Sequence, residues 1–191
     1  MPVSVLDGNV ALVVVDLQNA TVAQPGLAPL SGAEVVANTV RLAEAFRAAG
    51  QPVVLVRDVS LDGSDGVPGR SEFGSGAGRV LPEGWDAIVP GLEGDFVVSK
   101  RNWGAFYGTE LDDRLRRRGV TQVVVAGVAT SIGVDSTARG AHERGYHVVV
   151  VSDAVTDVNR QAHELAVGWT FRILGELGTV AEIGALLEQR A

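Results

Sequence analysis

The chain has 191 residues, of which 46% are hydrophobic and 20% are charged. This length and composition fit one folded domain with a large apolar interior and exclude a disordered chain. The formal net charge of −7 repels phosphate groups, so we expect neither nucleic acid nor an anionic membrane as a partner. Because cysteine is absent, disulfides, zinc–thiolate sites, iron–sulfur clusters and a cysteine nucleophile are all excluded.

The first residues lack the basic and apolar regions of a signal peptide, and no apolar run approaches the roughly 20 residues of a membrane span. We therefore expect a cytoplasmic protein. Short valine-rich runs are instead typical of strands that are buried on both faces. They lie at residues 10–15, 53–56, 96–98, 123–125 and 148–151.

Segments of helical period alternate with these runs, and the first three end at Gly50, Gly119 and Gly145. The predicted helices cover residues 31–49, 109–118, 131–144, 159–174 and 181–189. Alternating strands and helices favour a parallel sheet with helices on both faces. We predict a three-layer α/β/α fold around a doubly wound, six-stranded parallel sheet of Rossmann-like strand order 3-2-1-4-5-6, with residues 1–191 forming one domain.

A stretch rich in glycine, proline and serine, at residues 58–95, interrupts this alternation. Such a long irregular segment is either a cover for an active site or an ordinary surface loop. Its glycine-rich part, residues 74–78, follows no strand and opens no helix, so phosphate binding is not expected. The first strand is followed by Asp16-Leu17-Gln18-Asn19 instead of a dinucleotide fingerprint, so we expect no NAD and no other cofactor.

Polar groups follow three strands that we expect near the centre of the sheet. Asp16 follows the first strand, Lys100 follows the third, and the turn at residues 127–130 follows the fourth. Ligands of doubly wound sheets bind outside the carboxyl ends of the strands. The same residues also fit a structural ion pair, with a helix cap from Thr130 or Ser131.

Four segments carry a resemblance to a known family. They are VVVDLQNA around Asp16, KRNWGAFYGTELDDRLRRRGV from Lys100, VVVAGVATSIGVDSTARGAHERGYHVVVVSDAV from Val123, and the strand end at Asp153-Ala154. Over nearly its whole length the chain resembles the isochorismatase-like hydrolase superfamily.

The resemblance implies one of two chemistries. Amidases and carbamoyl hydrolases of this superfamily use an aspartate, a lysine and a cysteine, and the cysteine register falls here on Gly133. True isochorismatases keep the first two residues, carry glycine at that position, and cleave a vinyl ether without a covalent nucleophile. By resemblance Asp16 is the general acid/base, Lys100 orients it and neutralises a substrate carboxylate, and the amides of Ala129 and Gly133 face the reacting group. A nearby ammonium lowers the pKa of an aspartate, so burial has to outweigh Lys100 if Asp16 is to act as an acid.

The turn after the fourth strand departs from the isochorismatase pattern. It contains Gly-Val-Ala-Thr-Ser where isochorismatases have Gly-Val-Tyr-Ala-His, so the scaffold is closer to the cysteine branch without its cysteine. The alternative to a hydrolase is therefore a ligand-binding family member that has lost catalysis. The predicted substrate-binding residues are Gln18, Trp103, Phe106, Ala129 and Thr130.

Metal binding and assembly complete the prediction. His142, His147 and His163 lie outside the positions that hold a metal in related nicotinamidases, so no metal site is expected. The resemblance implies a homodimer or homotetramer, with a contact through the helices after Gly108 and Ser131.

Overall fold

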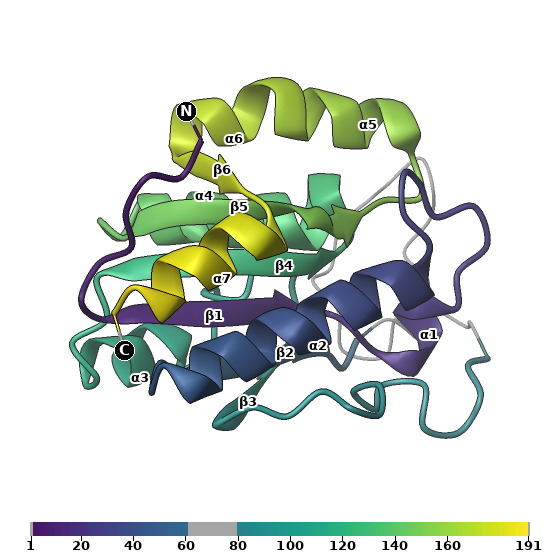
Figure 1. Ribbon diagram of the computed structural model, residues 1–191. Helices are drawn as coiled ribbons and strands as arrows, with labels where there is room; N and C mark the ends of the chain where they lie inside the picture. Colours follow the sequence, from purple (N-terminus) through teal and green to yellow (C-terminus); the bar gives the residue numbers. More distant parts are fainter. Residues whose placement is uncertain (1, 61–79, 191) are drawn as a thin grey trace.

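The computed structural model of the protein describes residues 2–60 and 80–190. Its centre is a parallel sheet of six strands in the order β3-β2-β1-β4-β5-β6 (Figure 1), which confirms the predicted topology. The strands are β1 (Val10–Val15), β2 (Val53–Asp58), β3 (Phe96–Lys100), β4 (Gln122–Val128), β5 (His147–Thr156) and β6 (Glu176–Gly178). Five of them coincide with the valine-rich runs. The sixth is too short to form an apolar run of its own.

The helices follow the predicted alternation. They are α1 (Asn19–Val22), α2 (Gly32–Ala48), α3 (Leu111–Arg116), η1 (Thr130–Val134), α4 (Asp135–His142), α5 (Arg160–Leu165), η2 (Ala166–Thr170), α6 (Phe171–Leu174) and α7 (Val180–Glu188). The segments η1 and η2 are π-helical and continue directly into α4 and α6. Only the short helix α1 had no counterpart in the sequence pattern.

Local sequence explains where α2 starts. The Ser31 hydroxyl accepts from the backbone N–H of Glu34, and the Glu34 carboxylate accepts from the backbone N–H of Ser31. This reciprocal capping satisfies two backbone donors at the helix start. The chain then turns at Gly50, whose φ of +68° is readily available to glycine.

Helices cover both faces of the sheet (Figure 1), and one apolar layer on each face separates the sheet from them. Side chains alternate across β1, so Val13 and Val15 belong to the layer under α3, α4 and α6. Leu12 and Val14 belong to the layer under α2 and α7. All of β1 is buried, which explains why it is a continuous run of apolar residues.

The irregular segment predicted at residues 58–95 is described only in part, because residues 61–79 lie outside the described ranges. Its second part runs beside the end of β1. The amide of Asn19 donates to the carbonyl of Ala87 over 3.0 Å, and the amide of Val89 donates to the carbonyl of Leu17 over the same distance. The chain therefore borders the carboxyl end of the central strand before it enters β3. Within the described ranges, no helix has both the length and the apolar character needed to cross a bilayer.

Candidate active site at the carboxyl ends of the strands

Three charged side chains meet where β1, β2 and β3 end. The Nζ atom of Lys100 lies 2.8 Å from Oδ2 of Asp16 and 3.3 Å from Oδ2 of Asp58, and all three residues are buried. Lys100 belongs to the edge strand β3 and not to a central strand as expected, so its side chain reaches past β2 to the end of β1. The third donor of its ammonium goes to the carbonyl of Asn102 over 3.0 Å. An ammonium has three donors, and all three are occupied here.

The two carboxylates on Lys100 differ in their other partners. Oδ1 of Asp58 accepts from both the amide and the hydroxyl of Ser60, each over 2.7 Å. Oδ1 of Asp16 is buried and has no hydrogen-bond partner among residues 2–60 and 80–190. Asp58 is thus held on both oxygens, whereas Asp16 keeps one oxygen free for a ligand or a proton.

Burial raises the pKa of Asp16 from its ordinary 3.8 to about 7. The charge of Lys100 and its hydrogen bond act in the opposite direction, and the charge of Asp58 adds to the increase. Of the two opposing influences expected from the sequence, burial therefore outweighs the ammonium. A carboxyl group with such a pKa can both give and take a proton near neutral pH.

The backbone also singles out Asp16. Its φ of +53° lies in the left-handed region, which residues other than glycine rarely adopt. The conformation is held by three hydrogen bonds. The Asp16 amide donates to the carbonyl of Val56 over 3.0 Å, and the Asp16 carbonyl accepts from the amide of Gln18 over 2.9 Å and from the hydroxyl of Thr21. Strained residues of this kind cluster at functional sites.

Gln18, predicted to bind substrate, is fully buried and ties together the chain around the site. Its side-chain N–H groups donate to the carbonyls of Asp58 over 2.9 Å and Asp86 over 3.1 Å. Its side-chain oxygen accepts from the amide of Asp58 over 2.8 Å. The observed role of this amide group is thus to fix the end of β2 and the segment at Asp86 relative to β1.

Gly133 lies beside the Asp16 carboxylate. A Cβ atom placed on Gly133 would stand 3.1 Å from Oδ2 of Asp16 and 3.1 Å from Cγ1 of Val15. The turn before it depends on another glycine, Gly127, which has a φ of +127° and whose Cβ would lie 2.0 Å from the carbonyl oxygen of Val15. No side chain fits there, so this glycine lets β4 approach the end of β1. Ala129 follows a cis peptide bond and precedes η1.

The start of η1 is capped differently from the prediction. Neither Thr130 nor Ser131 supplies the cap, because the amide of Ser131 donates over 2.7 Å to Oδ2 of Asp157, which comes from the chain after β5. The hydroxyl of Thr130 is fully buried and lies 2.9 Å from Nδ1 of His163 on α5. Burial lowers the pKa of His163, against an opposing influence of the Asp157 charge. These contacts join η1 to α5 beneath the site.

The two predicted aromatic residues have different surroundings. Trp103 is 67% exposed and follows Lys100 closely in the chain. Phe106 is only 4% exposed, and its ring centroid lies 5.8 Å from that of Tyr146. The guanidinium of Arg144 covers the same ring at 5.2 Å. Phe106 is therefore a core residue and not a pocket residue as predicted, whereas Trp103 is exposed.

Asp16, Lys100 and Gly133 lie together in the structure, and Asp58 joins them. In the sequence, Asp58 stands out only as the first residue of the long irregular segment. The signal that could have identified it is its position as a polar residue at the end of a strand next to β1. Among the described residues, no group of three histidine, aspartate or glutamate side chains could hold a metal ion.

Comparisons with known proteins identify relatives of this chain by sequence and by fold. The model of the isochorismatase domain matches residues 10–182. The uncharacterized isochorismatase family protein YecD of Escherichia coli O157:H7 is 40% identical over 91% of this chain and 93% of its own. A solved isochorismatase family protein from Burkholderia thailandensis superposes with a TM-score of 0.90 at 45% identity, covering 96% of this chain and 98% of the other.

A more distant relative carries a named activity. The ureidoacrylate amidohydrolase RutB of Rhizobium rhizogenes (strain K84) is 30% identical over all of this chain and 88% of its own. The match of the domain model over most of the chain, together with the sequence identities and the shared fold, identifies the family. The chain belongs to the isochorismatase family of hydrolases.

Proposed function

We propose that this protein hydrolyses a small vinyl ether of the isochorismate type by acid–base catalysis, without a covalent nucleophile. The observation that carries the proposal is the state of Asp16. It is buried, its pKa is raised to about 7, and one of its oxygens has no partner among the described residues. Proton transfer to carbon needs such an acid, and the chain offers no thiolate for the alternative chemistry.

The reaction proceeds in three steps. Asp16 gives its proton to the terminal methylene carbon of the enolpyruvyl ether, which leaves an oxocarbenium ion at the ether carbon. Water adds to that carbon and returns a proton to the Asp16 carboxylate. The resulting hemiketal collapses to the free alcohol and pyruvate, so one water molecule is consumed and the acid is regenerated.

Lys100 and Asp58 support this cycle. The 2.8 Å contact between Lys100 and Asp16 orients the carboxyl group toward its acceptor. Asp58 pairs with the same ammonium, so the charge of Lys100 stays compensated when Asp16 is protonated. Because the three donors of Lys100 are already occupied, its action on a substrate carboxylate is through space and not by a fourth hydrogen bond.

Gly133 occupies the position of the family's cysteine in this proposal. Its place beside Asp16 supports that register, since a side chain there would begin 3.1 Å from the carboxylate. Without a side chain, the same space is open to the reacting group of the substrate. The amides of Ala129 and Gly133 face that group, and Trp103 forms an exposed aromatic wall for a small planar acid.

A second candidate function is ligand binding without turnover. It is favoured by one observation, that a chain without cysteine is 30% identical to an amidohydrolase. In that case the site binds a carbonyl compound or an anion, and Asp16 has no chemical role.

Release of pyruvate from isochorismate by the purified protein, measured at several pH values, separates the two functions. We expect the wild type to release pyruvate. We expect Asp16→Asn to release it at least a hundredfold more slowly, because the variant lacks the general acid. Asp7→Asn is the matched control, because Asp7 contacts Thr121 and His147 at the opposite end of the sheet. Equal rates in the wild type and Asp16→Asn would overturn the proposed mechanism.

Gly133→Cys tests the second candidate. If the protein descends from the cysteine branch and has lost catalysis, this substitution should create hydrolysis of ureidoacrylate where the wild type shows none. If the wild type releases pyruvate, we expect Gly133→Cys to reduce that release, because the new side chain fills the space beside Asp16.

A further inference from the structure

The buried group formed by Lys100, Asp16 and Asp58 contains one cation and two carboxyl groups. The Lys100 ammonium lies 2.8 Å from Asp16 and 3.3 Å from Asp58, and its third donor goes to a backbone carbonyl. When both carboxyl groups are ionised, the group therefore carries one uncompensated negative charge. Because Asp58 shares the ammonium, an ionised Asp16 is only partly neutralised and takes up a proton readily.

The two oxygens of Asp16 differ in their surroundings. Oδ2 is held by Lys100, whereas Oδ1 is buried and has no hydrogen-bond partner among residues 2–60 and 80–190. Hydrogen bonds to a carboxylate favour its charged form, so an oxygen that accepts none is the better base. Oδ1 is thus the atom of this group that can take a proton from a bound molecule.

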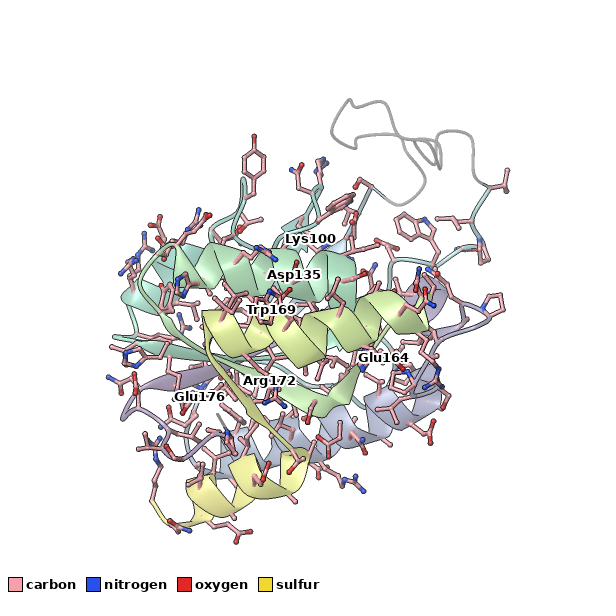
Figure 2. All side chains as sticks on the ribbon, turned by 90° about the horizontal axis from the view of Figure 1, so that it is seen from above. Lys100, Asp135, Glu164, Trp169, Arg172 and Glu176 are labelled. Atoms are coloured by element: carbon pink, nitrogen blue, oxygen red, sulfur yellow. The ribbon has the colours of Figure 1, made fainter. Side chains whose placement is uncertain are left out.

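The space beside the Asp16 carboxylate has a polar side and an apolar side. A Cβ atom on Gly133 would lie 3.1 Å from Oδ2 of Asp16 and 3.1 Å from Cγ1 of the buried Val15. Figure 2 shows Lys100 near Asp135, the first residue of α4, into which η1 continues. A small molecule with a methyl or methylene group next to a carbonyl group suits such a place, which the proposed function gives to the reacting group.

Proton transfer between Asp16 and carbon has two directions. The proposed hydrolysis begins when the protonated carboxyl group gives its proton to a methylene carbon. By microscopic reversibility, the ionised carboxylate can remove a proton from a carbon next to a carbonyl group. The charge then moves to the carbonyl oxygen, which needs hydrogen-bond donors. In the proposed function, the amides of Ala129 and Gly133 face the reacting group and supply them.

We propose that this site also catalyses the enolisation of small α-keto acids, with Asp16 as the base. The bond between hydrogen and the carbon next to the carbonyl breaks, its electron pair forms the carbon–carbon double bond of the enolate, and the carbonyl π electrons move to oxygen. The proton goes to Oδ1 of Asp16, exchanges with water and returns to the same carbon, so no co-reactant is consumed. Pyruvate, the product of the proposed hydrolysis, belongs to this class of substrate, so the inference rests on the proposed function.

Exchange of the methyl hydrogens of pyruvate for deuterium tests the proposal. It is followed by proton NMR in heavy water with the full chain, and the exchange in buffer alone is subtracted. We expect the wild type to exchange these hydrogens at least about a hundredfold faster than Asp16→Asn, which lacks the base. Asp7→Asn is the matched control and should keep the wild-type rate, because Asp7 contacts Thr121 and His147 at the opposite end of the sheet.

The two activities of Asp16 should respond to pH in opposite directions. Lys100 and Asp58 are the charged groups that influence the pKa of Asp16, which is about 7. Enolisation needs the ionised carboxylate, so exchange should be about tenfold faster at about pH 8 than at about pH 6. Hydrolysis of isochorismate needs the protonated form, so its rate should fall by about the same factor. A merely structural role of Asp16 would change both rates in the same direction.

The compound 2-oxobutyrate gives a second readout, because its methylene carbon carries two hydrogens that a chiral site distinguishes. With the carbonyl group held by the amides, only one of these hydrogens points toward Oδ1 of Asp16. We therefore expect one hydrogen to exchange at least about tenfold faster than the other, whereas both exchange equally in buffer.

The outcomes separate this inference from the proposed function. Exchange no faster than in buffer would overturn the inference, and pyruvate release from isochorismate by the same preparation would then leave the proposed function intact. Exchange that depends on Asp16, without release of pyruvate from isochorismate, would support the inference and remove the vinyl ether as substrate. Equal exchange in the wild type and Asp16→Asn, or equal exchange of both hydrogens of 2-oxobutyrate, would also overturn the inference.

Discussion

Two regions of this molecule reverse the usual distribution of residues between core and surface. At the ends of β1, β2 and β3, an ammonium and two carboxylates are buried, whereas Leu165, Trp169 and Ile173 on the helix formed by α5, η2 and α6 are exposed. Charged residues are rarely buried unless paired, and large apolar residues seldom line up in water. The buried charges have partners within the chain. The three apolar side chains stay more than half exposed, so the two regions differ in what would stabilise them.

The largest effect is expected from removing the cation of the buried group. Lys100→Met leaves Asp16 and Asp58 buried side by side without their shared partner. We expect the free energy of unfolding to fall by about 3–5 kcal/mol at about pH 8, and by less in mild acid, where Asp16 takes up a proton. Urea unfolding at both pH values measures this loss.

An exposed ion pair gives the matched comparison. Arg139 lies 3.0 Å from Asp135 on the surface of α4, and Arg139→Met should cost under about 1 kcal/mol. If the two substitutions cost the same, burial would not be what makes the Lys100 group important for stability.

The second effect is a gain in the free energy of unfolding, which we expect from Asp16→Asn. Above its ordinary pKa of 3.8 an unfolded Asp16 is ionised, whereas the folded protein keeps the proton up to a pKa of about 7. The folded state thus binds more protons over this range, so the free energy of unfolding falls as the pH rises through it. Asp16→Asn removes this dependence and leaves Lys100 paired with Asp58.

We therefore expect Asp16→Asn to be more stable than the wild type at about pH 8, by up to about 4 kcal/mol, since the pKa is raised by about three units and one unit corresponds to about 1.4 kcal/mol. Near pH 4 the two proteins should be about equally stable. Unfolding curves across this range measure the difference, and a variant that is less stable at every pH would show that Asp16 is ionised in the folded protein.

The fold was predictable because its signals are local. Each buried strand of the sheet centre is a valine-rich run, and α2 and α4 have a helical period that stops at Gly50 and Gly145. Six strands were predicted, but no residues could be assigned to β6, because Glu176–Gly178 is short and only its last residue is buried. Its place in the sheet follows from the path of the chain and not from its own residues.

The site was predictable only in part, because its geometry depends on contacts between distant segments. Asp16 and Lys100 stand out in motifs, but Asp58 becomes visible only when β2 is placed between their strands. Gln18 belongs to the first motif, yet its bonds to Asp58 and Asp86 cross long stretches of sequence. The pKa of Asp16 likewise depends on how deeply the side chain is buried, and a sequence motif does not indicate this.

The third effect concerns the difference between the two carboxylates. The charge of Asp58 helps to raise the pKa of Asp16. We expect Asp58→Asn to lower that pKa below its value of about 7, with a change of roughly 1 kcal/mol in the free energy of ionisation. Carbon-13 NMR of the aspartate carboxyl groups during a pH titration follows Asp16 directly.

Asp86→Asn is the control for Asp58→Asn. Asp86 pairs with Arg57 at 3.4 Å and lies in the part of the chain that runs beside the end of β1. It has no ion pair with Lys100. If both substitutions shift the titration of Asp16 equally, the effect comes from a general loss of negative charge and not from the shared ammonium.

The smallest effect is expected for the hydrogen bond between Thr130 and His163, which joins η1 to α5. The Thr130 hydroxyl and the His163 ring are 2.9 Å apart, and burial lowers the pKa of His163, which favours the neutral ring. Thr130→Val keeps the shape of the side chain but leaves a ring nitrogen of His163 without its partner. This should lower the free energy of unfolding by about 1 kcal/mol.

Thr121→Val is the control, because the Thr121 hydroxyl is exposed and bonded to Asp7, so its loss should lower the free energy of unfolding by less. Equal losses in urea unfolding would mean that the bond to His163 adds nothing to stability beyond what an exposed bond gives, and that η1 is held mainly by Asp157.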